Sequence, residues 1–369
     1  MNPDLRPSSL SRTVKCPAWL LTVGCVPNTP TSTSAADEGT AAHEVLHRAL
    51  VGLTQFEIGK RTAIGVPVTQ DMIEYANEFK RRLGHVNLFS ELKIDCSCIY
   101  AGMTGTADVV IHDTASRLLH IMDYKYGFAW VSPVDNYQLL AYCMGFWDSL
   151  GRPGGYTFML SIYQPRAYHA DGVVRSVTLD SKALVDYFAQ MRQACETAMT
   201  PNNNEYHVGA HCLYCPRRHV CGTLSAATDN IYEWLNQPQS AIDTQPSGQS
   251  TELSMMASAE ILLKAKRTAL ELVIMEGIKS GKSGYRHMIK QAAGRLQWAI
   301  PIDQVTTIGN MFGVELTHPE PITPTQALKL GVPVGIIQDA SERLPGAVSL
   351  KEIKETTLKN MFSAVSLPR

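Results

Sequence analysis

The sequence predicts an α/β protein in which a central mixed β-sheet lies between helices, followed by a smaller α+β domain. Apolar residues first recur at helical spacing, over 36–50 and again over 71–83. Segments typical of strands then follow at 92–97, 105–111, 118–124 and 156–163. Helical spacing returns at 134–150 and 184–199. Strands in mid-chain with helices before and after them favour a sheet covered by helices on both faces.

Each element rests on its own pattern. In the first helix Ala42, Val45 and Leu46 fall on one face. The segment 92–97 alternates apolar and polar residues, as a half-buried strand does, whereas 118–124 is almost continuously apolar.

A polar segment separates this part of the chain from the rest. Residues 237–251 hold two prolines and no apolar period, and 226–253 is therefore expected to be a linker. A helix over 254–279, a β-like stretch over 285–299 and short helices near 302–312 and 323–338 follow. The predicted domains are 1–225 and 254–369.

Composition excludes several classes of protein. Of the 369 residues, 45% are hydrophobic and 18% charged, which permits a large core and excludes wholesale disorder. The net charge of -1 excludes a protein that coats nucleic acid by bulk attraction. The sequence contains no run of 18 apolar residues, so no membrane span is predicted. The nine cysteines are unevenly spread and do not resemble a secreted disulfide framework. The expected location is the cytoplasm.

Two acidic residues and a lysine form the first chemical pattern. Asp123 and Lys125 are two apart on a predicted strand, so their side chains emerge on one face. Asp108 ends the neighbouring strand, where it could meet Asp123. Two adjacent carboxylates repel unless a divalent cation lies between them, and hard oxygen ligands suit Mg²⁺ or Mn²⁺. A lysine beside such a cation can orient an attacking water. The alternative is an Asp–Lys surface pair on an edge strand.

A second pattern lies on the next predicted helix. Gln138 and Tyr142 are four residues apart and share one helix face. Beside a metal site, an amide and a phenol facing the same way could hold a phosphate backbone. The alternative is a polar-edge amide next to a core tyrosine.

Four cysteines form a third pattern. Cys212, Cys215 and Cys221 follow the spacing C-x₂-C-x₅-C, and Cys16 stands alone near the N-terminus. Four thiolates bind a [4Fe–4S] cluster or a zinc ion. The loop that holds the three cysteines is too polar for inert core residues, but spacing alone does not tie Cys16 to them.

A competing motif occurs on the first helix. His43-Glu44-Val45-Leu46-His47 matches H-E-x-x-H, in which both histidines bind zinc and the glutamate acts as base in metalloproteases. This interpretation predicts a zinc peptidase. It leaves the Asp–Lys, Gln–Tyr and cysteine patterns without a purpose.

Taken together, the other patterns resemble the RecB-like branch of the PD-(D/E)XK nuclease superfamily. The resemblance rests on the order of five motifs: Glu38–His43 on a helix, Glu91, Gly105-x-x-Asp108, Asp123-x-Lys125 and Gln138-x-x-x-Tyr142. Iron–sulfur members, such as the AddB nuclease domain and CRISPR-associated exonucleases, carry one cysteine before the core and three after it. The resemblance covers residues 8–225 and is nearest to a phage- and prophage-borne subfamily.

The resemblance implies a restriction-endonuclease-like core and a residue set. The implied metal ligands are His43, Asp108, Asp123 and the backbone carbonyl of Tyr124. The implied catalytic residues are Glu91, Asp108, Asp123, Lys125, Gln138 and Tyr142, the last two lining the DNA path. A solvated strand start remains the alternative role for Glu91. The implied ligands of a structural [4Fe–4S] cluster are Cys16, Cys212, Cys215 and Cys221, with zinc as the alternative.

Basic residues concentrate toward the C-terminal part. Residues 255–295 hold eight basic and three acidic side chains, and Lys282 and Arg286 are the expected phosphate contacts. The expected function is a Mg²⁺- or Mn²⁺-dependent deoxyribonuclease, an exonuclease acting on DNA ends or single strands. It would serve phage recombination, replication or processing, with a recombination or single-strand-binding protein as partner. The alternatives are a DNA-binding or assembly module of the same fold and a zinc peptidase.

Overall fold

The computed structural model describes residues 5–20, 34–54, 56–236, 245–298, 300, 302–318, 320–321 and 323–352. The chain forms two compact units, Met1–Arg267 and Thr268–Arg369. Each unit is described by itself below.

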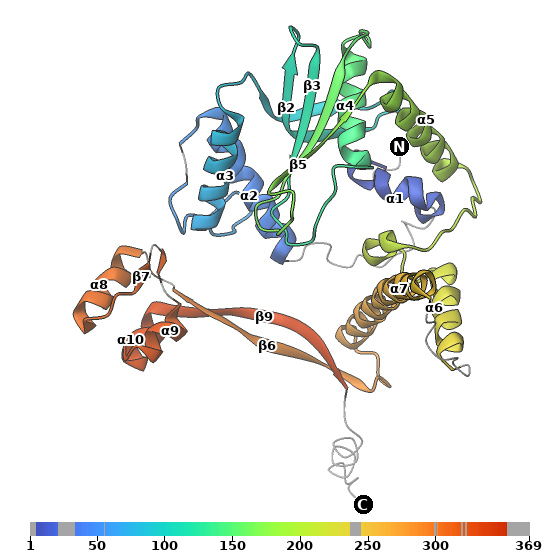
Figure 1. Ribbon diagram of the computed structural model, residues 1–369. Coiled ribbons are helices and arrows are strands. Elements are labelled where there is room, and N and C mark those ends of the chain that lie inside the picture. The colour runs from blue at the N-terminus through green and yellow to red at the C-terminus, as the bar shows by residue number, and fades with distance from the viewer. Residues whose placement is uncertain are drawn as a thin grey trace, which may run out of the picture. The chain divides into compact units, whose positions relative to one another are not determined.

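The first unit is built on one five-stranded mixed sheet (Figure 1). Its strands, in spatial order, are β1 (Phe89–Asp95), β2 (Thr104–Asp113), β3 (Leu118–Tyr124), β4 (Thr157–Tyr163) and β5 (Val174–Leu179). The first three pair antiparallel, β4 runs parallel to β3, and β5 runs antiparallel to β4. The parallel step needs a crossover, which helix α4 (Tyr137–Ser149) supplies. The predicted mixed sheet is confirmed; its edge strand β5 was not predicted.

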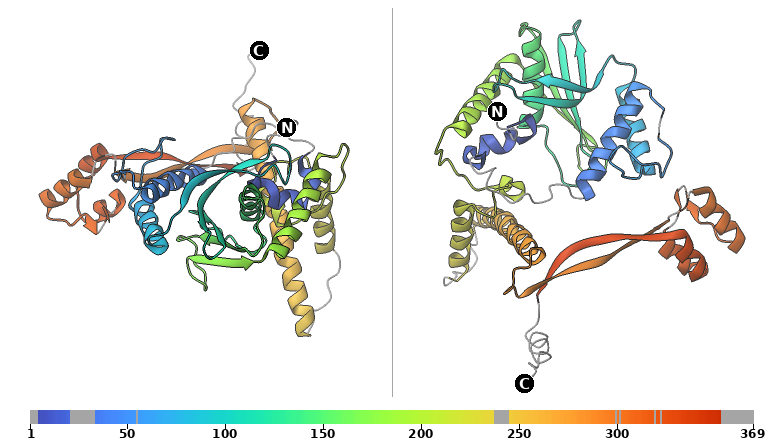
Figure 2. Two further views of the ribbon diagram at one scale, coloured as in Figure 1. Left: turned by 90° about the horizontal axis from the view of Figure 1, so that it is seen from above. Right: turned by 180° about the vertical axis from the view of Figure 1, so that it is seen from behind.

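Helices cover both faces of this sheet, as predicted (Figures 1 and 2). On one face α2 (Ser34–Val51) and α3 (Gln70–Leu83) pack together against Met122 and Tyr124 of β3. On the other face α4, α5 (Ser181–Met199) and the short α1 (Leu10–Lys15) share a core with Ile121. Neighbouring residues of β3 thus enter opposite cores, which explains its continuously apolar sequence.

Side-chain caps set where these helices begin. Thr69, Asn136 and Asp180 each accept a hydrogen bond from the backbone N–H three residues later, at the starts of α3, α4 and α5. Such caps satisfy backbone donors that the helix itself leaves unpaired. Helix α4 therefore starts at Tyr137, later than its apolar pattern suggests.

The segment that the sequence predicts as a linker is largely helical where the structure describes it. Within 226–253 the described residues are mainly helical, in α6 (Gly222–Leu235) and the start of α7 (Pro246–Lys279), while 237–244 lie outside the described residues. Hydroxyls in the first turns of α7 donate to carbonyls four residues earlier, as Thr251 does to Ser247. Polar side chains satisfied in this way permit a helix without an apolar period. The compact units divide after Arg267, inside α7, rather than at this segment.

The second unit is a small α+β arrangement. Strands β6 (His287–Trp298) and β9 (Ser341–Glu352) form an antiparallel ribbon, and β7 (Thr317–His318) pairs with β8 (Glu320–Pro321). Three helices follow β6 in the chain: α8 (Ile302–Phe312), α9 (Pro324–Lys329) and α10 (Val334–Ala340). Their core holds Val305, Leu316, Ala327, Val332 and Ile337. Strand β9 was not predicted. In the described part of the chain, no helix is long and apolar enough to cross a membrane.

Candidate active site

The sheet splits between β2 and β3. Their pairing runs from Asp113–Leu118 to Val109–Met122; beyond that pair, in the described sheet, β2 continues against β1 and β3 against β4. Extending the register by one residue sets Asp108 opposite Asp123. At this point the backbone N–H of Tyr124 donates to Asp108 Oδ2 at 2.7 Å. The carboxylate thus takes the place of the backbone acceptor that the departing strand no longer supplies, and its position is fixed by strand geometry.

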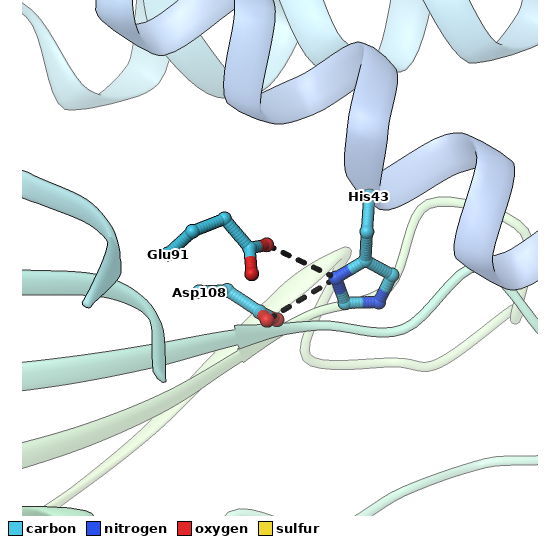
Figure 3. Close-up of side chains that lie close together, drawn as sticks. All are labelled: His43, Glu91 and Asp108. Carbon is cyan, nitrogen blue, oxygen red and sulfur yellow. Dashed lines mark ion pairs between the residues drawn. The ribbon is translucent and has the colours of Figure 1, made fainter. Parts of the chain in front are cut away.

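His43 meets Asp108 from the helical layer above. On α2, His43 Nδ1 lies 3.1 Å from Asp108 Oδ1 and 4.0 Å from Glu91 Oε1 (Figure 3). Its ring packs against Tyr124 with centroids 5.3 Å apart. One ligand atom each from His43, Glu91 and Asp108 falls within 4.8 Å of the others. An imidazole and two carboxylates at this spacing form a group that can hold a divalent cation.

Glu91 reaches this group through an unusual backbone. Register pairs Ser90 with Val109 and Leu92 with Ala107, so Glu91 stands opposite Asp108 on the neighbouring strand. Its φ of 55° lies in the left-handed region although it is inside β1. Such a conformation costs a non-glycine residue about 1–3 kcal/mol and is retained where its surroundings impose it. Whether Glu91 acts at the site or is a solvated strand start stays a prediction.

Asp123 and Lys125 form a close ion pair at the end of β3. Lys125 Nζ lies 2.9 Å from Asp123 Oδ1 and 2.8 Å from Oδ2. The Asp123 side chain is 5% exposed and that of Lys125 30%. Burial raises the pKa of Asp123, Lys125 lowers it and Asp108 raises it, so the net shift is upward. Burial lowers the pKa of Lys125, but the charge of Asp123 more than offsets this, and the pKa stays above its ordinary value.

The pKa values of Glu91 and His43 are both raised at this site. Burial, then the charge of Asp108, raise the pKa of Glu91. Burial lowers the pKa of His43, but the charge and hydrogen bond of Asp108 raise it by more, so the net pKa of the imidazole is above its ordinary value. A bound cation would offset the repulsion between the carboxylates.

Gln138 and Tyr142 lie on the α4 side of the split. Gln138 Nε2 donates to the Tyr142 hydroxyl at 3.4 Å. Burial chiefly raises the pKa of Tyr142 to about 12, with the charges of Asp123 and Asp108 adding to it. Gly105 leaves room for this ring, because a Cβ there would sit 2.6 Å from Tyr142 Cε1. Tyr142 is therefore both a core residue and a neighbour of the carboxylates.

The four cysteines lie around one cavity of the first unit. Cys16, Cys212, Cys215 and Cys221 line one small cavity with Trp19, Tyr206 and Arg217. Cys16 Sγ accepts the His207 N–H at 3.5 Å, and Cys221 Sγ accepts the Leu224 N–H at 3.4 Å. Among the described residues, no three of these sulfurs lie within 4.8 Å of one another. The structure thus brings Cys16 to the C-x₂-C-x₅-C loop, which spacing alone did not indicate.

The H-E-x-x-H residues do not converge. His47 Nδ1 lies 2.9 Å from the Ser90 hydroxyl, and Glu44 Oε2 accepts the Ala63 N–H at 2.9 Å. In the described part of the chain, the partners of His43 in the cation-binding group are Glu91 and Asp108. His47 and Glu44 are engaged elsewhere.

Lys282 and Arg286 belong to the second unit, between α7 and β6. Gly281 and Gly284, both at positive φ, turn the chain there. Lys282 and Arg286 are both exposed. Their contact with DNA stays a prediction.

Comparison with known proteins identifies the family. The family model described as "Protein of unknown function (DUF2800)" matches residues 3–295. The chain belongs to this family. No curated protein matches. Among solved structures, one titled "Crystal structure of SSO0001" is 15% identical, with 58% of this chain and 84% of that chain covered and a TM-score of 0.33. A likeness of this size carries no argument about fold or function.

The DUF2800 match spans every residue of the candidate site. It includes α2 with His43, the split sheet, α4 and the four cysteines, and it ends within β6. The site and the cysteine cavity therefore lie in the region that this family model describes.

Proposed function

We propose that this DUF2800 protein is a Mg²⁺- or Mn²⁺-dependent deoxyribonuclease of the PD-(D/E)XK, RecB-like type. One observation carries the proposal: Asp108 and the Asp123–Lys125 ion pair stand together where β2 and β3 part. The Asp123–Lys125 pair is not on a solvated edge strand, because Asp123 belongs to β3, the central strand of the sheet. A buried carboxylate on a central strand, as Asp123 is, is costly without a task.

The donor set fits a hard divalent cation. His43, Asp108 and Asp123 would hold it, with the Tyr124 carbonyl as a further ligand and Glu91 beside them. The raised pKa values of Glu91 and Asp123 support this, because they arise from burial and mutual repulsion that a cation would offset. When bound, Mg²⁺ or Mn²⁺ would supply charge for a phosphodiester oxygen and make water more acidic.

The protein's own residues would do the positioning. Lys125, held by Asp123, would orient the attacking water and balance negative charge on the phosphate. The Tyr124 N–H fixes the Asp108 carboxylate, so that it faces His43 and a bound cation in one orientation. Gln138 and Tyr142, on the α4 side, would contact the DNA backbone.

We propose a structural [4Fe–4S] cluster at the four cysteines, with zinc as the alternative. Burial raises the thiol pKa of Cys16, Cys212 and Cys215, so these thiols are protonated and inert unless a metal takes the proton's place. The cluster would join α1 to the segment before α6. Absorbance with iron, sulfide and zinc analysis after anaerobic purification separates the two metals.

The proposed setting is DNA recombination, replication or processing in phage or prophage, in the bacterial cytoplasm, with exonucleolytic action on DNA ends or single strands. A recombination or single-strand-binding protein would be the partner. Lys282 and Arg286 would add phosphate contacts outside the first unit.

The deciding experiment is digestion of linear and circular DNA with Mg²⁺ or Mn²⁺. Asp123→Asn and Lys125→Ala should abolish cleavage, while the control Asp186→Asn, exposed on α5, should leave it intact. DNA that is bound but never cut by the wild type would favour the assembly-module alternative. Absence of DNA cleavage together with zinc-dependent peptide hydrolysis that needs His47 and survives Asp123→Asn would favour the zinc peptidase.

A further inference from the structure

The loop after Lys125 presents aromatic rings to solvent. Phe128 is 68% exposed and Trp130 52%, and Tyr168 on the adjoining β4–β5 loop is 96% exposed. Large aromatic side chains gathered on a surface in this way mark an interaction site more often than chance exposure. We call Phe128, Trp130 and Tyr168, with Arg166 and His169 beneath them, the aromatic platform.

Hydrogen bonds with Gln164 hold the backbone that carries Phe128 and Trp130. Gln164 is fully buried and donates from Nε2 to the carbonyl oxygens of Gly127 and Ala129, both at 2.8 Å. Its Oε1 accepts the Val131 N–H at 3.1 Å and Arg175 Nη2 at 2.8 Å. The three bonds to backbone groups hold the chain on both sides of the two exposed rings. A ligand that docks there has little loop entropy to remove.

Cationic side chains support the rings from the protein side. The Arg166 guanidinium lies 4.1 Å from the Phe128 centroid, and that of Arg175 lies 5.9 Å from the Trp130 centroid. Trp130 also stacks on His169, with centroids 5.4 Å apart and an angle of 14°. Rings backed in this way keep an outer surface for another flat π-system, with positive charge close by for a phosphate.

The platform adjoins the candidate active site. Phe128 is three residues beyond Lys125, so their Cα atoms are at most about 11 Å apart. A series of ring contacts also joins them: His43 packs on Tyr124, Tyr124 on Tyr126, and Arg166 lies 4.3 Å from the Tyr126 centroid. Arg166 pairs with Glu38 of α2 at 3.1 Å, which ties the platform to the helix that carries His43.

We propose that the aromatic platform stacks unpaired bases of single-stranded DNA and so leads a strand to the catalytic residues. This inference rests on the proposed nuclease function for its choice of DNA. Stacking on exposed rings backed by arginine is how proteins hold single strands without reading sequence. Protein interfaces also use aromatic and arginine side chains. The choice of single-stranded DNA therefore rests on the position of the platform, with Phe128 three residues beyond Lys125 and Arg166 tied to the helix that carries His43.

Binding without cleavage tests the platform. Anisotropy of labelled oligothymidine is measured in EDTA for wild type and two double variants. Phe128→Leu with Trp130→Leu keeps apolar bulk and removes stacking; Phe128→Tyr with Trp130→Phe keeps stacking. We expect the leucine variant to bind about 5- to 150-fold more weakly per ring lost, and the aromatic variant to bind like wild type. The control Tyr232→Leu, an exposed ring on α6, should change nothing.

Further arms separate the explanations. Affinity for a blunt duplex should be equal in all variants, and the loss on oligothymidine should persist at raised salt, because stacking is not ionic. Unchanged oligothymidine binding in the leucine variant, equal loss on duplex, or tighter binding of oligouridine than of oligothymidine would overturn the platform. Loss of co-purifying protein with DNA binding intact would overturn it in favour of a protein surface. Cleavage by the wild type is scored separately, so the platform can fail while the nuclease proposal holds, and the reverse.

Discussion

The Asp123–Lys125 pair allows a quantitative test of the site's electrostatics. With Nζ 2.8–2.9 Å from both carboxylate oxygens, Coulomb's law at an effective dielectric constant of about 20 gives about 6 kcal/mol of attraction. Desolvation of the buried carboxylate offsets much of this energy. Removing one partner of a buried pair typically costs about 3–5 kcal/mol. Because Lys125 is 30% exposed, we expect Lys125→Met to lower the unfolding free energy by about 3 kcal/mol.

Two further measurements complete this test. The charge-neutral variant Asp123→Asn with Lys125→Met should recover most of the loss, because no unpaired charge stays buried. If a cation binds at Asp123, Mg²⁺ should stabilise Lys125→Met more than wild type, since the ion then replaces the lost positive charge. Urea unfolding in EDTA and in Mg²⁺ measures both effects. A Lys125→Met variant as stable as wild type, or a double variant no better than the single, would refute the reasoning.

Three other predictions follow from single contacts. Gly105→Ala should cost about 1–3 kcal/mol and reduce cleavage, because the new methyl overlaps the Tyr142 ring; unchanged urea unfolding would contradict this. Burial lowers the pKa of His120 to about 4 in the folded protein, whereas its pKa in the unfolded chain is about 6.5. As pH falls below about 6.5, His120 therefore binds a proton in the unfolded chain before it does so in the folded protein, which favours unfolding. Stability present at pH 7 should drop by about 2 kcal/mol at pH 5, and His120→Gln should remove that dependence in urea unfolding. Cys16→Ser should lose the bound iron or zinc found by metal analysis, whereas Cys98→Ser, away from the cavity, should retain it.

Local patterns were sufficient for most of the first unit. Alternation and helical spacing depend on neighbours within a few residues, and they predicted α2, α3, α4 and the strands β1–β4. The edge strand β5 was missed because its six residues, Val174–Leu179, alternate too briefly to stand out from a loop. The start of α7 was missed because its serine and threonine hydroxyls donate to backbone carbonyls four residues earlier, a pattern that composition does not reveal.

Features that depend on distant residues were beyond the sequence. Two-residue spacing was enough to suggest that Asp123 and Lys125 face the same way. The left-handed φ of Glu91, which sets it beside Asp108, leaves no mark in the residue type. Cys16 joins cysteines almost 200 positions later only because α1 packs against α5 and the segment before α6. The aromatic platform was missed because exposure of Phe128 and Trp130 depends on the buried Gln164 beneath them.

The candidate site is a consequence of where two strands separate. As β2 leaves β3, the Tyr124 N–H loses its backbone acceptor, and an unmet buried donor costs about 1–3 kcal/mol. Asp108 satisfies that donor and thereby becomes fixed, with one oxygen turned to the strand and the other to His43. The same separation opens the space that Tyr142 enters from α4, against Gly105. The fold therefore requires an acceptor at residue 108, whereas a charged one, next to Asp123 and Glu91, is required only if the site binds a cation.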